Sequence, residues 1–330
     1  MGRLIFITIL IFVLCSNIRA QEWGYEPPIG PSEWPSISPS YSECGEGTMQ
    51  SPVDIITDTV VMSEEGTGLF LLHNDMMRNG TLVNDGHTVE FQADDPTNTN
   101  APTIALVHNG DDPFFTGRTL GDRYHLNSLD FHWGSTDSQG SEHFINSEGT
   151  VGEVHFNYFN SEYTNFTTAA QQSDGLTIIA LRLRVCANSD FNTVFGTDNE
   201  YLETLSNDES VSGINWRLSD LHECESIIVG VCNDKFYVYH GSLTIPPCYQ
   251  SALWWVSAQS RCITRQQLDL LRMQRVSTDG AILVNNYRPL QDVDGRTIQQ
   301  TGLNSASSLS QSLMINLLTL IMLFLVVLAL

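Results

Sequence analysis

The chain has 330 residues, of which 38 are Asp or Glu and 15 are Lys or Arg, so its formal net charge is −23 at pH 7. Such an acidic chain repels phosphate backbones and anionic lipid headgroups, which excludes nucleic-acid binding as a function class. Between two apolar end segments lie about 280 residues, which is enough for one large domain with a substantial core.

The first segment has the pattern of a secretory signal. Arg3 precedes the apolar run LIFITILIFVLC, and the small residue Ala20 ends the segment. The run is too short to span a bilayer, and a basic start followed by an apolar stretch and a small residue is typical of exported proteins. We expect residues 1–20 to be a signal peptide that is removed.

The last segment has the pattern of a GPI-attachment signal. The small and polar stretch NSASSLSQS begins at Asn304 and leads into the uncharged tail MINLLTLIMLFLVVLAL. This order is typical of a GPI signal. A single membrane span is the alternative, but it usually carries Lys or Arg after the span. We therefore expect residues 304–330 to be removed and residues 21–303 to form a domain on the outer face of the plasma membrane, or secreted.

Six cysteines remain once Cys15 leaves with the signal peptide. An even number in an exported chain predicts up to three disulfides, for which fifteen pairings exist. The sequence contains no C-x-x-C pair, so a zinc site built on thiolates is not expected. The sequons at Asn79 and Asn165 are candidate N-glycosylation sites.

The elements are predicted as follows in chain order. The stretch from Gln21 to Tyr41 is rich in Pro, Gly and aromatic residues, so we expect it to lie irregularly over the surface, held by Trp23, Tyr25 and Trp34. Alternating or β-branched runs, separated by Gly, Asn, Asp and Pro, then predict strands. These runs cover residues 81–92, 103–108, 124–133, 153–159, 175–186, 235–243 and 252–258. The clearest helical pattern covers residues 265–273, which gives one β-dominated domain with a large sheet and few helices.

A candidate metal site lies on two of the predicted strands. Asp130 and His132 are two residues apart, so their side chains point to the same face, and His155 lies on the next predicted strand. Catalytic zinc uses three protein ligands and one open position, and two histidines with one carboxylate are an accepted set. Spacing alone is a weak signal, because most D-x-H pairs are surface residues.

The order of motifs strengthens this interpretation. QSPVDI, NDGHTV, FHWGS, GSEH, EVHFNYFN, SLTIPPC and NNYRP follow one another along the chain. In this order they resemble the α-class carbonic anhydrases, and the resemblance covers residues 22–300. It implies a ten-stranded, mostly antiparallel twisted sheet with Zn²⁺ at the foot of a conical cleft. It also implies reversible hydration of CO2 to bicarbonate and a proton.

The resemblance implies roles residue by residue. His132 and His155 match the second and third zinc ligands, and Asp130 stands where active members have a histidine as the first. Residues that support the ligands would be Ser128, in place of a glutamine, together with Glu153 and Asn286. His143 and Tyr239 match a structural pair beneath the site.

The catalytic residues are implied in the same way. Thr244 matches the threonine that accepts a hydrogen bond from the attacking hydroxide, and Glu142 matches the glutamate that orients this threonine. His87 matches the proton shuttle, and Tyr25 matches a tyrosine that orders the shuttle waters. The apolar pocket for CO2 would be walled by Asn157, in place of a valine, and by Ile178, Leu243 and Trp254.

The resemblance also implies a disulfide between Cys44 and Cys248. For the other four cysteines our expectation is that Cys186 pairs with Cys262 and that Cys224 pairs with Cys232.

Two hypotheses follow from the replacement of the first ligand by Asp130. An anionic ligand reduces the effective charge on zinc and makes its bound water less acidic, which predicts a slow carbonic anhydrase with an alkaline-shifted pH profile. The alternative is a catalytically inactive relative that serves as a cell-surface or matrix interaction protein. We favour the enzyme, because Glu142, Thr244 and His87 are retained.

Overall fold

The computed structural model describes residues 23–63, 68–72, 77–97, 103–107, 114, 122–186, 199–205, 210–217, 235–276 and 280–301. Within these ranges, no helix combines the length and the apolar character needed to cross a bilayer. The predicted signal peptide, the predicted GPI signal, and Cys224 and Cys232 lie outside the described residues, so these expectations stay predictions.

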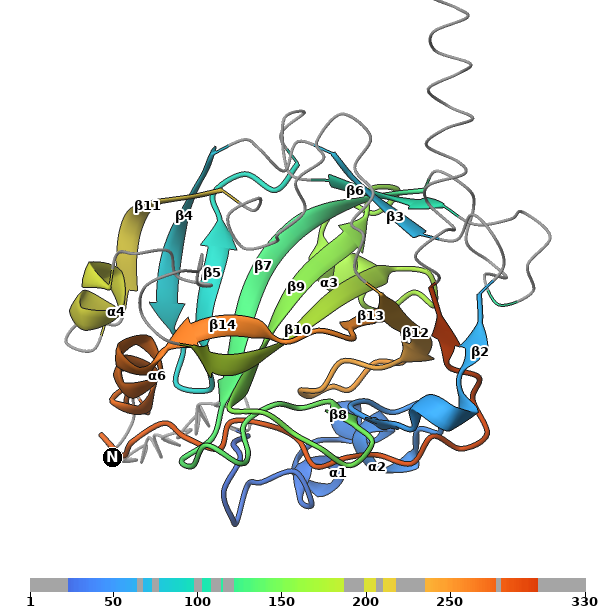
Figure 1. The fold of residues 1–330 in the computed structure, drawn as a ribbon, viewed down its shortest axis with the longest axis horizontal. Helices are drawn as coiled ribbons and strands as arrows, with labels where there is room; N and C mark the ends of the chain where they lie inside the picture. Colours follow the sequence, from blue (N-terminus) through green and yellow to red (C-terminus); the bar gives the residue numbers. More distant parts are fainter. Residues whose placement is uncertain are drawn as a thin grey trace, which may run out of the picture.

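One large β-sheet forms the body of the domain, and its long central strands curve across the molecule (Figure 1). Thirteen strands of the described residues belong to it. In chain order they are β2 (Val61–Met62), β3 (Gly68–Leu72), β4 (Met77–Asn84), β5 (Val89–Ala93), β6 (Thr103–Val107), β7 (Arg123–Trp133), β9 (Gly152–Asn160), β10 (Leu176–Cys186), β11 (Ser210–Arg217), β12 (Phe236–Gly241), β13 (Ala252–Ser257), β14 (Arg261–Thr264) and β15 (Gln299–Gln300). The remaining strands, β1 (Asp54–Ile55) and β8 (Phe144–Ile145), form a separate parallel pair.

The strand order across the sheet is β11-β4-β5-β7-β9-β10-β13-β12-β15-β2, with β6 beside β7, β3 beside β6 and β14 beside β10. Neighbours from β11 to β10 run antiparallel, whereas β13 and β14 run parallel to β10. The predicted β-dominated, mainly antiparallel fold is therefore confirmed. The sheet has thirteen strands instead of ten, and this total includes the two-residue strands β2 and β15.

Strand alternation separates an apolar core from a polar face. On β9, Val154, Phe156 and Tyr158 point into the largest apolar cluster, while the residues between them face the opposite side. Both faces of β9 are buried, because its neighbours and the elements packed on the sheet cover it. The polar face of this strand is where the candidate site is built.

The helices are short and lie around the sheet. They are α1 (Trp34–Ile37), α2 (Glu43–Glu46), α3 (Phe166–Ala169), α4 (Glu200–Leu205) and α6 (Arg265–Arg272), with single 3₁₀ turns η1 (Pro39–Tyr41) and η2 (Thr57–Thr59). The predicted helix at residues 265–273 is confirmed, and a capping box between Thr264 and Gln267 fixes its start. In Figure 1, α4 and α6 lie together at one end of the sheet.

The N-terminal segment differs from the expectation of an irregular surface strip. Within residues 23–41 it forms the short helical turns α1 and η1, α2 follows just after, and Trp34 is fully buried. Pro35 and Pro39 each stand at the start of a helical turn, where the fixed backbone angle of proline suits a helix and its missing N–H costs nothing. Trp23 and Tyr25 pack against Trp34, as expected.

Two disulfides link distant parts of the chain. Cys44 is bonded to Cys248, as the resemblance implies, and Cys186 is bonded to Cys262, as we expected for that pair. The first closes a loop with a sequence separation of 204 residues and ties α2 to the segment before β13. It therefore holds the N-terminal helices close to one wall of the site.

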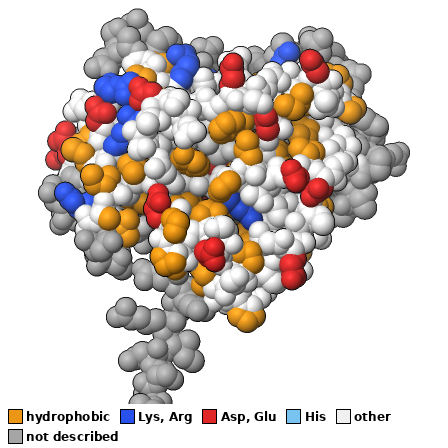
Figure 2. Space-filling view, turned by 90° about the horizontal axis from the view of Figure 1, so that it is seen from below, with side chains coloured by type: hydrophobic (Ala, Val, Ile, Leu, Met, Phe, Trp, Pro, Cys, Tyr) orange, Lys and Arg blue, Asp and Glu red, His pale blue; other side chains and the backbone are white. Residues whose placement is uncertain are grey.

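The surface mixes apolar with acidic side chains. On the face in Figure 2, apolar side chains are scattered among acidic and uncharged ones. The most exposed large apolar side chains are Val61 and Met62 on β2, and Met273 and Ile282 near the end of α6. This pattern agrees with the acidic, solvated surface expected from the net charge.

Candidate metal centre

The register of three central strands assembles the site. A bulge between Leu126 and Ser128 on β7 shifts the pairing with β9 by one residue, so that three cross-strand pairs lie on one face of the sheet. These pairs are Ser128 with Asn157, Asp130 with His155, and His132 with Glu153. On the other side of β7, Glu90 of β5 lies directly opposite Asp130.

His132 and His155 lie next to each other, with ring centroids 4.5 Å apart, and both are buried. Nδ1 of His132 lies 2.7 Å from the carbonyl oxygen of Asn286, and Nε2 of His155 lies 2.7 Å from Oε1 of Glu153. Because a carbonyl and a carboxylate only accept, these ring nitrogens carry the protons. The lone pairs of His132 Nε2 and His155 Nδ1 are thus free to bind a metal.

Glu153 organises the layer beneath the histidines. Its carboxylate accepts hydrogen bonds from His155 Nε2, from His143 Nδ1 at 2.7 Å and from the His143 backbone N–H at 2.9 Å. Burial opposes the charged form of Glu153, but the hydrogen bonds and charges of these histidines hold its pKa well below the usual value. His143 Nε2 lies 2.7 Å from the hydroxyl of Tyr239, which agrees with the predicted structural pair.

The electrostatics of His155 suit a metal ligand. Burial, and then the neighbouring His132, lower the pKa of His155. A lowered pKa keeps the imidazole neutral at pH 7, which is the form that coordinates metals.

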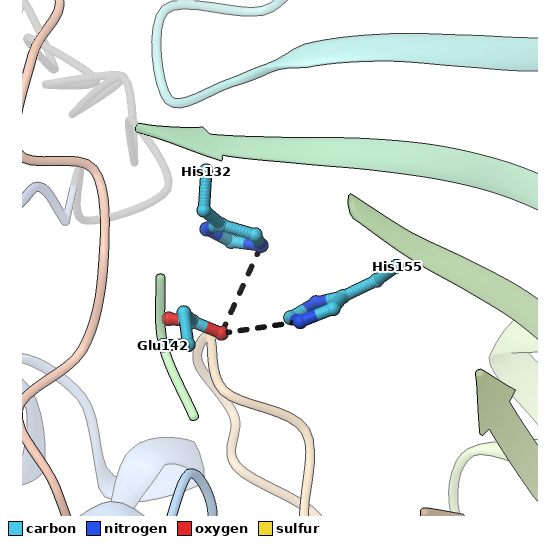
Figure 3. A group of neighbouring side chains, drawn as sticks. All are labelled: His132, Glu142 and His155. Atoms are coloured by element: carbon cyan, nitrogen blue, oxygen red, sulfur yellow. Dashed lines mark ion pairs between the residues drawn. The ribbon is translucent and has the colours of Figure 1, made fainter. Parts of the chain in front are cut away.

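Glu142 lies between the two imidazoles (Figure 3). Its Oε1 accepts the backbone N–H of Arg288 at 2.7 Å, and its Oε2 lies 3.8 Å from Nε2 of each histidine. Among the hydrogen bonds of the described residues, Oε2 has no partner, so the expected bond to Thr244 is not formed there. A buried carboxylate oxygen without a donor is costly, which favours a cation close by.

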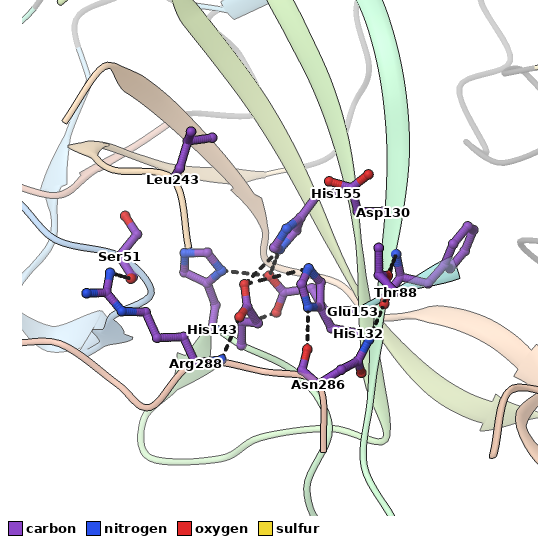
Figure 4. Close-up of polar contacts among 12 residues, drawn as sticks. Ser51, Thr88, Asp130, His132, His143, Glu153, His155, Leu243, Asn286 and Arg288 are labelled. Carbon is purple, nitrogen blue, oxygen red and sulfur yellow. Dashed lines mark hydrogen bonds and ion pairs between the residues drawn. The ribbon is translucent and has the colours of Figure 1, made fainter. Parts of the chain in front are cut away.

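Asp130 is held apart from this group. Its Oδ2 accepts a hydrogen bond from Asn157 Nδ2 at 2.5 Å, and its Oδ1 accepts one from Ser128 Oγ at 3.3 Å. Burial, followed by the charge of Glu90, raises the pKa of Asp130 well above its usual value. In Figure 4 the Asp130 carboxylate stands outside the contacts that surround Glu153.

The group of potential ligand atoms that lie close together is therefore His132, Glu142 and His155, without Asp130. A second such group, His143, Glu153 and His155, is already joined by hydrogen bonds of 2.7 Å. The structure brings together two of the three predicted ligands. The third, Asp130, is turned toward the hydroxyl of Ser128, the residue implied to support it, and toward the amide of Asn157, which was implied only as a wall of the CO2 pocket. Its role as a ligand stays a prediction.

A cavity of about 180 Å³ opens above the two histidines. The predicted site residues that line it are Tyr25, His87, Ser128, Asp130, His132, His155, Asn157, Ile178, Leu243, Thr244 and Trp254. Other lining residues were not predicted: Trp23, Asp85, Thr88, Glu90, Asn127, Phe166 and Ile245. The alternation of residues 88–91 could have indicated Thr88 and Glu90, because residues two apart share a face of a strand.

His87 lies at the mouth of the cavity. Its Nε2 is 2.8 Å from the carbonyl oxygen of Trp23, and its ring stacks on the indole of Trp23 with centroids 3.9 Å apart. Its side chain is 23% exposed, and its Nδ1 lies 3.9 Å from a carboxylate oxygen of Asp85. The ring thus contacts both the cavity and solvent.

Tyr25 stands beside His87 with its hydroxyl buried. Among the described residues this hydroxyl has no hydrogen-bond partner, and burial followed by the charge of Glu142 raises its pKa well above the usual value. The hydroxyl is therefore protonated at neutral pH and can donate to a water in the cavity.

Together these features define a buried cavity on the face of a twisted, mainly antiparallel sheet, with His132 and His155 as candidate metal ligands. The model of the eukaryotic-type carbonic anhydrase family matches residues 29–302, which include nearly all of the described structure and every residue of the site except Trp23 and Tyr25. The chain therefore belongs to the eukaryotic-type carbonic anhydrase family. The family resemblance drawn from the motifs is confirmed.

Proposed function

We propose that this protein is a zinc-dependent carbonic anhydrase that hydrates CO2 to bicarbonate and a proton, with lower activity than a site of three histidines provides. The observation that carries the proposal is the pair His132 and His155. Each is buried, and each uses one ring nitrogen in a hydrogen bond of 2.7 Å, which leaves the other nitrogen free as a ligand.

The donor set fits zinc. Two imidazoles and a nearby carboxylate are nitrogen and oxygen donors of the kind that catalytic zinc accepts. Asp130 remains the proposed third ligand, because it lines the cavity as the two histidines do. Glu142 is less suited, since it does not line the cavity and the His155 nitrogen it faces is already bonded to Glu153. When bound, zinc supplies Lewis-acid activation of water.

The cavity walls fit an uncharged substrate. Ile178, Leu243 and Trp254 form an apolar side on which CO2 can rest without losing hydrogen bonds. Thr244 lines the same cavity, where its hydroxyl can orient the nucleophile. Asn157, which lies beside Ile178 in the sheet, and Asp130 make part of the cavity wall polar, which is one reason to expect reduced activity.

His87 is the residue proposed to carry the proton from the cavity to solvent. Its position at the mouth, in contact with the cavity and with solvent, suits a group that takes a proton from cavity water and releases it to buffer. Tyr25 supports this path by donating a hydrogen bond to water from its buried hydroxyl.

The experiment is zinc analysis combined with stopped-flow CO2 hydration between pH 6 and 9. We expect one zinc per chain after incubation with the metal, and a hydration rate that rises toward alkaline pH, because an anionic ligand lowers the effective charge on zinc. His132→Ala is the negative control and should lose both zinc and activity. Stoichiometric zinc without hydration above background at any of these pH values would contradict the proposal.

We also infer that the protein acts outside the cell, anchored through GPI or secreted. Support comes from the two disulfides, which form in oxidising compartments, and from the exposure of Asn79 and Asn165. Release of the protein from cells by a phosphatidylinositol-specific phospholipase, with a mass shift after glycosidase treatment, tests both features. A protein that stays on the membrane after lipase treatment would favour a membrane span.

A further inference from the structure

We propose that Asn157, together with Ser128, is a positioning residue that holds Asp130 away from the metal and thereby weakens metal binding. The inference rests on the proposed function, because the metal is the same one. It concerns how tightly this chain binds zinc, and it assigns that property to an amide that stands where the resemblance implies a valine of the CO2 pocket.

The strand register gives Asp130 a choice of neighbours. Asp130 lies directly opposite His155 on β9, and Asn157 is two residues further along the same face. A residue in an antiparallel pair reaches both its direct partner and the diagonal neighbour. The short carboxylate of Asp130 can therefore turn either toward the histidines or toward Asn157, and in the structure it is turned toward Asn157.

The amide of Asn157 is fully committed to this arrangement. One proton of Nδ2 goes to Asp130 Oδ2 at 2.5 Å, and the same nitrogen lies 3.2 Å from Ser128 Oγ. Ser128 in turn donates to the other oxygen of Asp130 at 3.3 Å. Each oxygen of the Asp130 carboxyl group thus lies within hydrogen-bond distance of a donor, and these two contacts hold the side chain in this orientation.

The surroundings keep the amide in place. Asn157 is 4% exposed, and it pairs with Ile178 on β10, which offers no polar group to compete for the amide protons. If Asn157 held Asp130 in place as a metal ligand, one carboxylate oxygen of Asp130 would point toward the histidines. Here the close group of potential ligand atoms contains His132, Glu142 and His155 and does not contain Asp130. Metal binding by Asp130 therefore requires that its bond to Asn157 be broken.

The test is the zinc dissociation constant of purified variants, measured by competition with a chromophoric chelator. Asn157→Val removes the donor, and we expect zinc to bind roughly tenfold more tightly or better, since a buried hydrogen bond to Asp130 no longer has to be broken. Ser128→Ala should shift the constant in the same direction by less.

A second pair of variants separates positioning from a general effect on the fold. In the Asp130→Ala background, adding Asn157→Val should no longer change zinc affinity, because the residue that it positions is absent. A tighter constant in both backgrounds, or an unchanged or weaker one in Asn157→Val alone, would overturn the proposal. Thermal unfolding checks that each variant is folded. If Asn157→Val does not fold, Ser128→Ala takes its place as the test variant.

The two proposals fail in different ways. If wild type hydrates CO2 but Asn157→Val binds zinc no more tightly, the positioning role is wrong and the enzyme assignment stands. If Asn157→Val tightens zinc binding as expected but neither protein hydrates CO2, the positioning role stands and the enzyme assignment is wrong.

Discussion

The backbone carbonyl of Asn286 accepts the Nδ1 proton of His132 at 2.7 Å, across 154 residues of sequence. The side chain of the same asparagine accepts the backbone N–H of Trp133 at 2.8 Å and donates to the carbonyl oxygens of Phe131 and His87. One residue therefore fixes the tautomer of His132, which is a proposed ligand, the end of β7, and the turn that carries His87, the proposed proton shuttle.

Replacing Asn286 by Asp is expected to destabilise the fold and the site together. The new carboxylate keeps the acceptor for Trp133 but places an oxygen against the two carbonyls that Nδ2 now satisfies. Leaving buried acceptors without donors should reduce the free energy of unfolding by about 1–3 kcal/mol, and zinc affinity should fall as well. Urea denaturation measures the first effect and chelator competition the second. Unchanged stability and affinity would show that Asn286 does not support the ligand.

Replacing Asp130 by His is expected to raise both zinc affinity and turnover. A third imidazole restores a neutral ligand, and the more positive zinc then activates water closer to neutral pH. The pH profile of hydration should move to lower pH compared with wild type. Elemental analysis and stopped-flow hydration between pH 6 and 9 give the answer, with Asp130→Asn as a control of similar size that lacks both charge and imidazole. A variant that changed neither quantity would show that Asp130 is not at the metal.

Much of the fold could be predicted because its signals are local. Alternation of apolar and polar residues marks β7 and β9, and the same period of two puts Asp130 and His132 on one face. The helix α6 carries its own start signal in Thr264 and Gln267. Patterns of this kind depend only on residues close together in the sequence, so they can be recognised without knowledge of the tertiary packing.

The orientation of Asp130 could not be predicted, because it depends on tertiary choices. The bulge between Leu126 and Ser128 sets which residue of β9 lies opposite each residue of β7. No local sequence pattern predicts this bulge. The carboxyl group of Asp130 then accepts a hydrogen bond from the amide of Asn157 and is turned away from the histidines. The contact of His87 with the carbonyl of Trp23 could not be predicted for the same reason, because the two residues are far apart in the sequence and meet only in the folded chain.

Replacing His87 by Ala is expected to slow proton removal and to leave the CO2 step intact. The maximal hydration rate in dilute buffer should fall tenfold or more, because a positioned proton carrier typically contributes at least ~10²-fold. kcat/KM should change little, since the proposed role of His87 is to transfer a proton from the mouth of the cavity and not to take part in the attack on CO2. Adding concentrated imidazole buffer should restore most of the rate. A uniform loss of kcat and kcat/KM that buffer does not rescue would instead indicate damage to the site.

The pairing of Asp137 with two arginines predicts a small, pH-dependent contribution to stability. Hydrogen bonds from Arg265, followed by those from Arg272, lower the pKa of Asp137 to about 2 against an ordinary value of 3.8. A carboxylate with a lowered folded-state pKa stabilises the protein above its unfolded pKa, and this stabilisation is lost as the pH falls toward 2. Because Asp137 is half exposed, the contribution at pH 7 should not exceed about 1 kcal/mol.

Asp137→Asn should therefore unfold at a lower urea concentration than wild type at pH 7, and the difference should shrink between pH 4 and pH 2. Salt at 1 M should also reduce the difference at pH 7, because it screens exposed charges. Ser138→Ala, one residue away in the same exposed loop, is the matched control and should show no such pH dependence. These ion pairs connect the loop before Glu142 to α6. If the difference in urea midpoint between wild type and Asp137→Asn persisted at pH 2, Asp137 would stabilise this loop through its shape and hydrogen bonds and not through its charge.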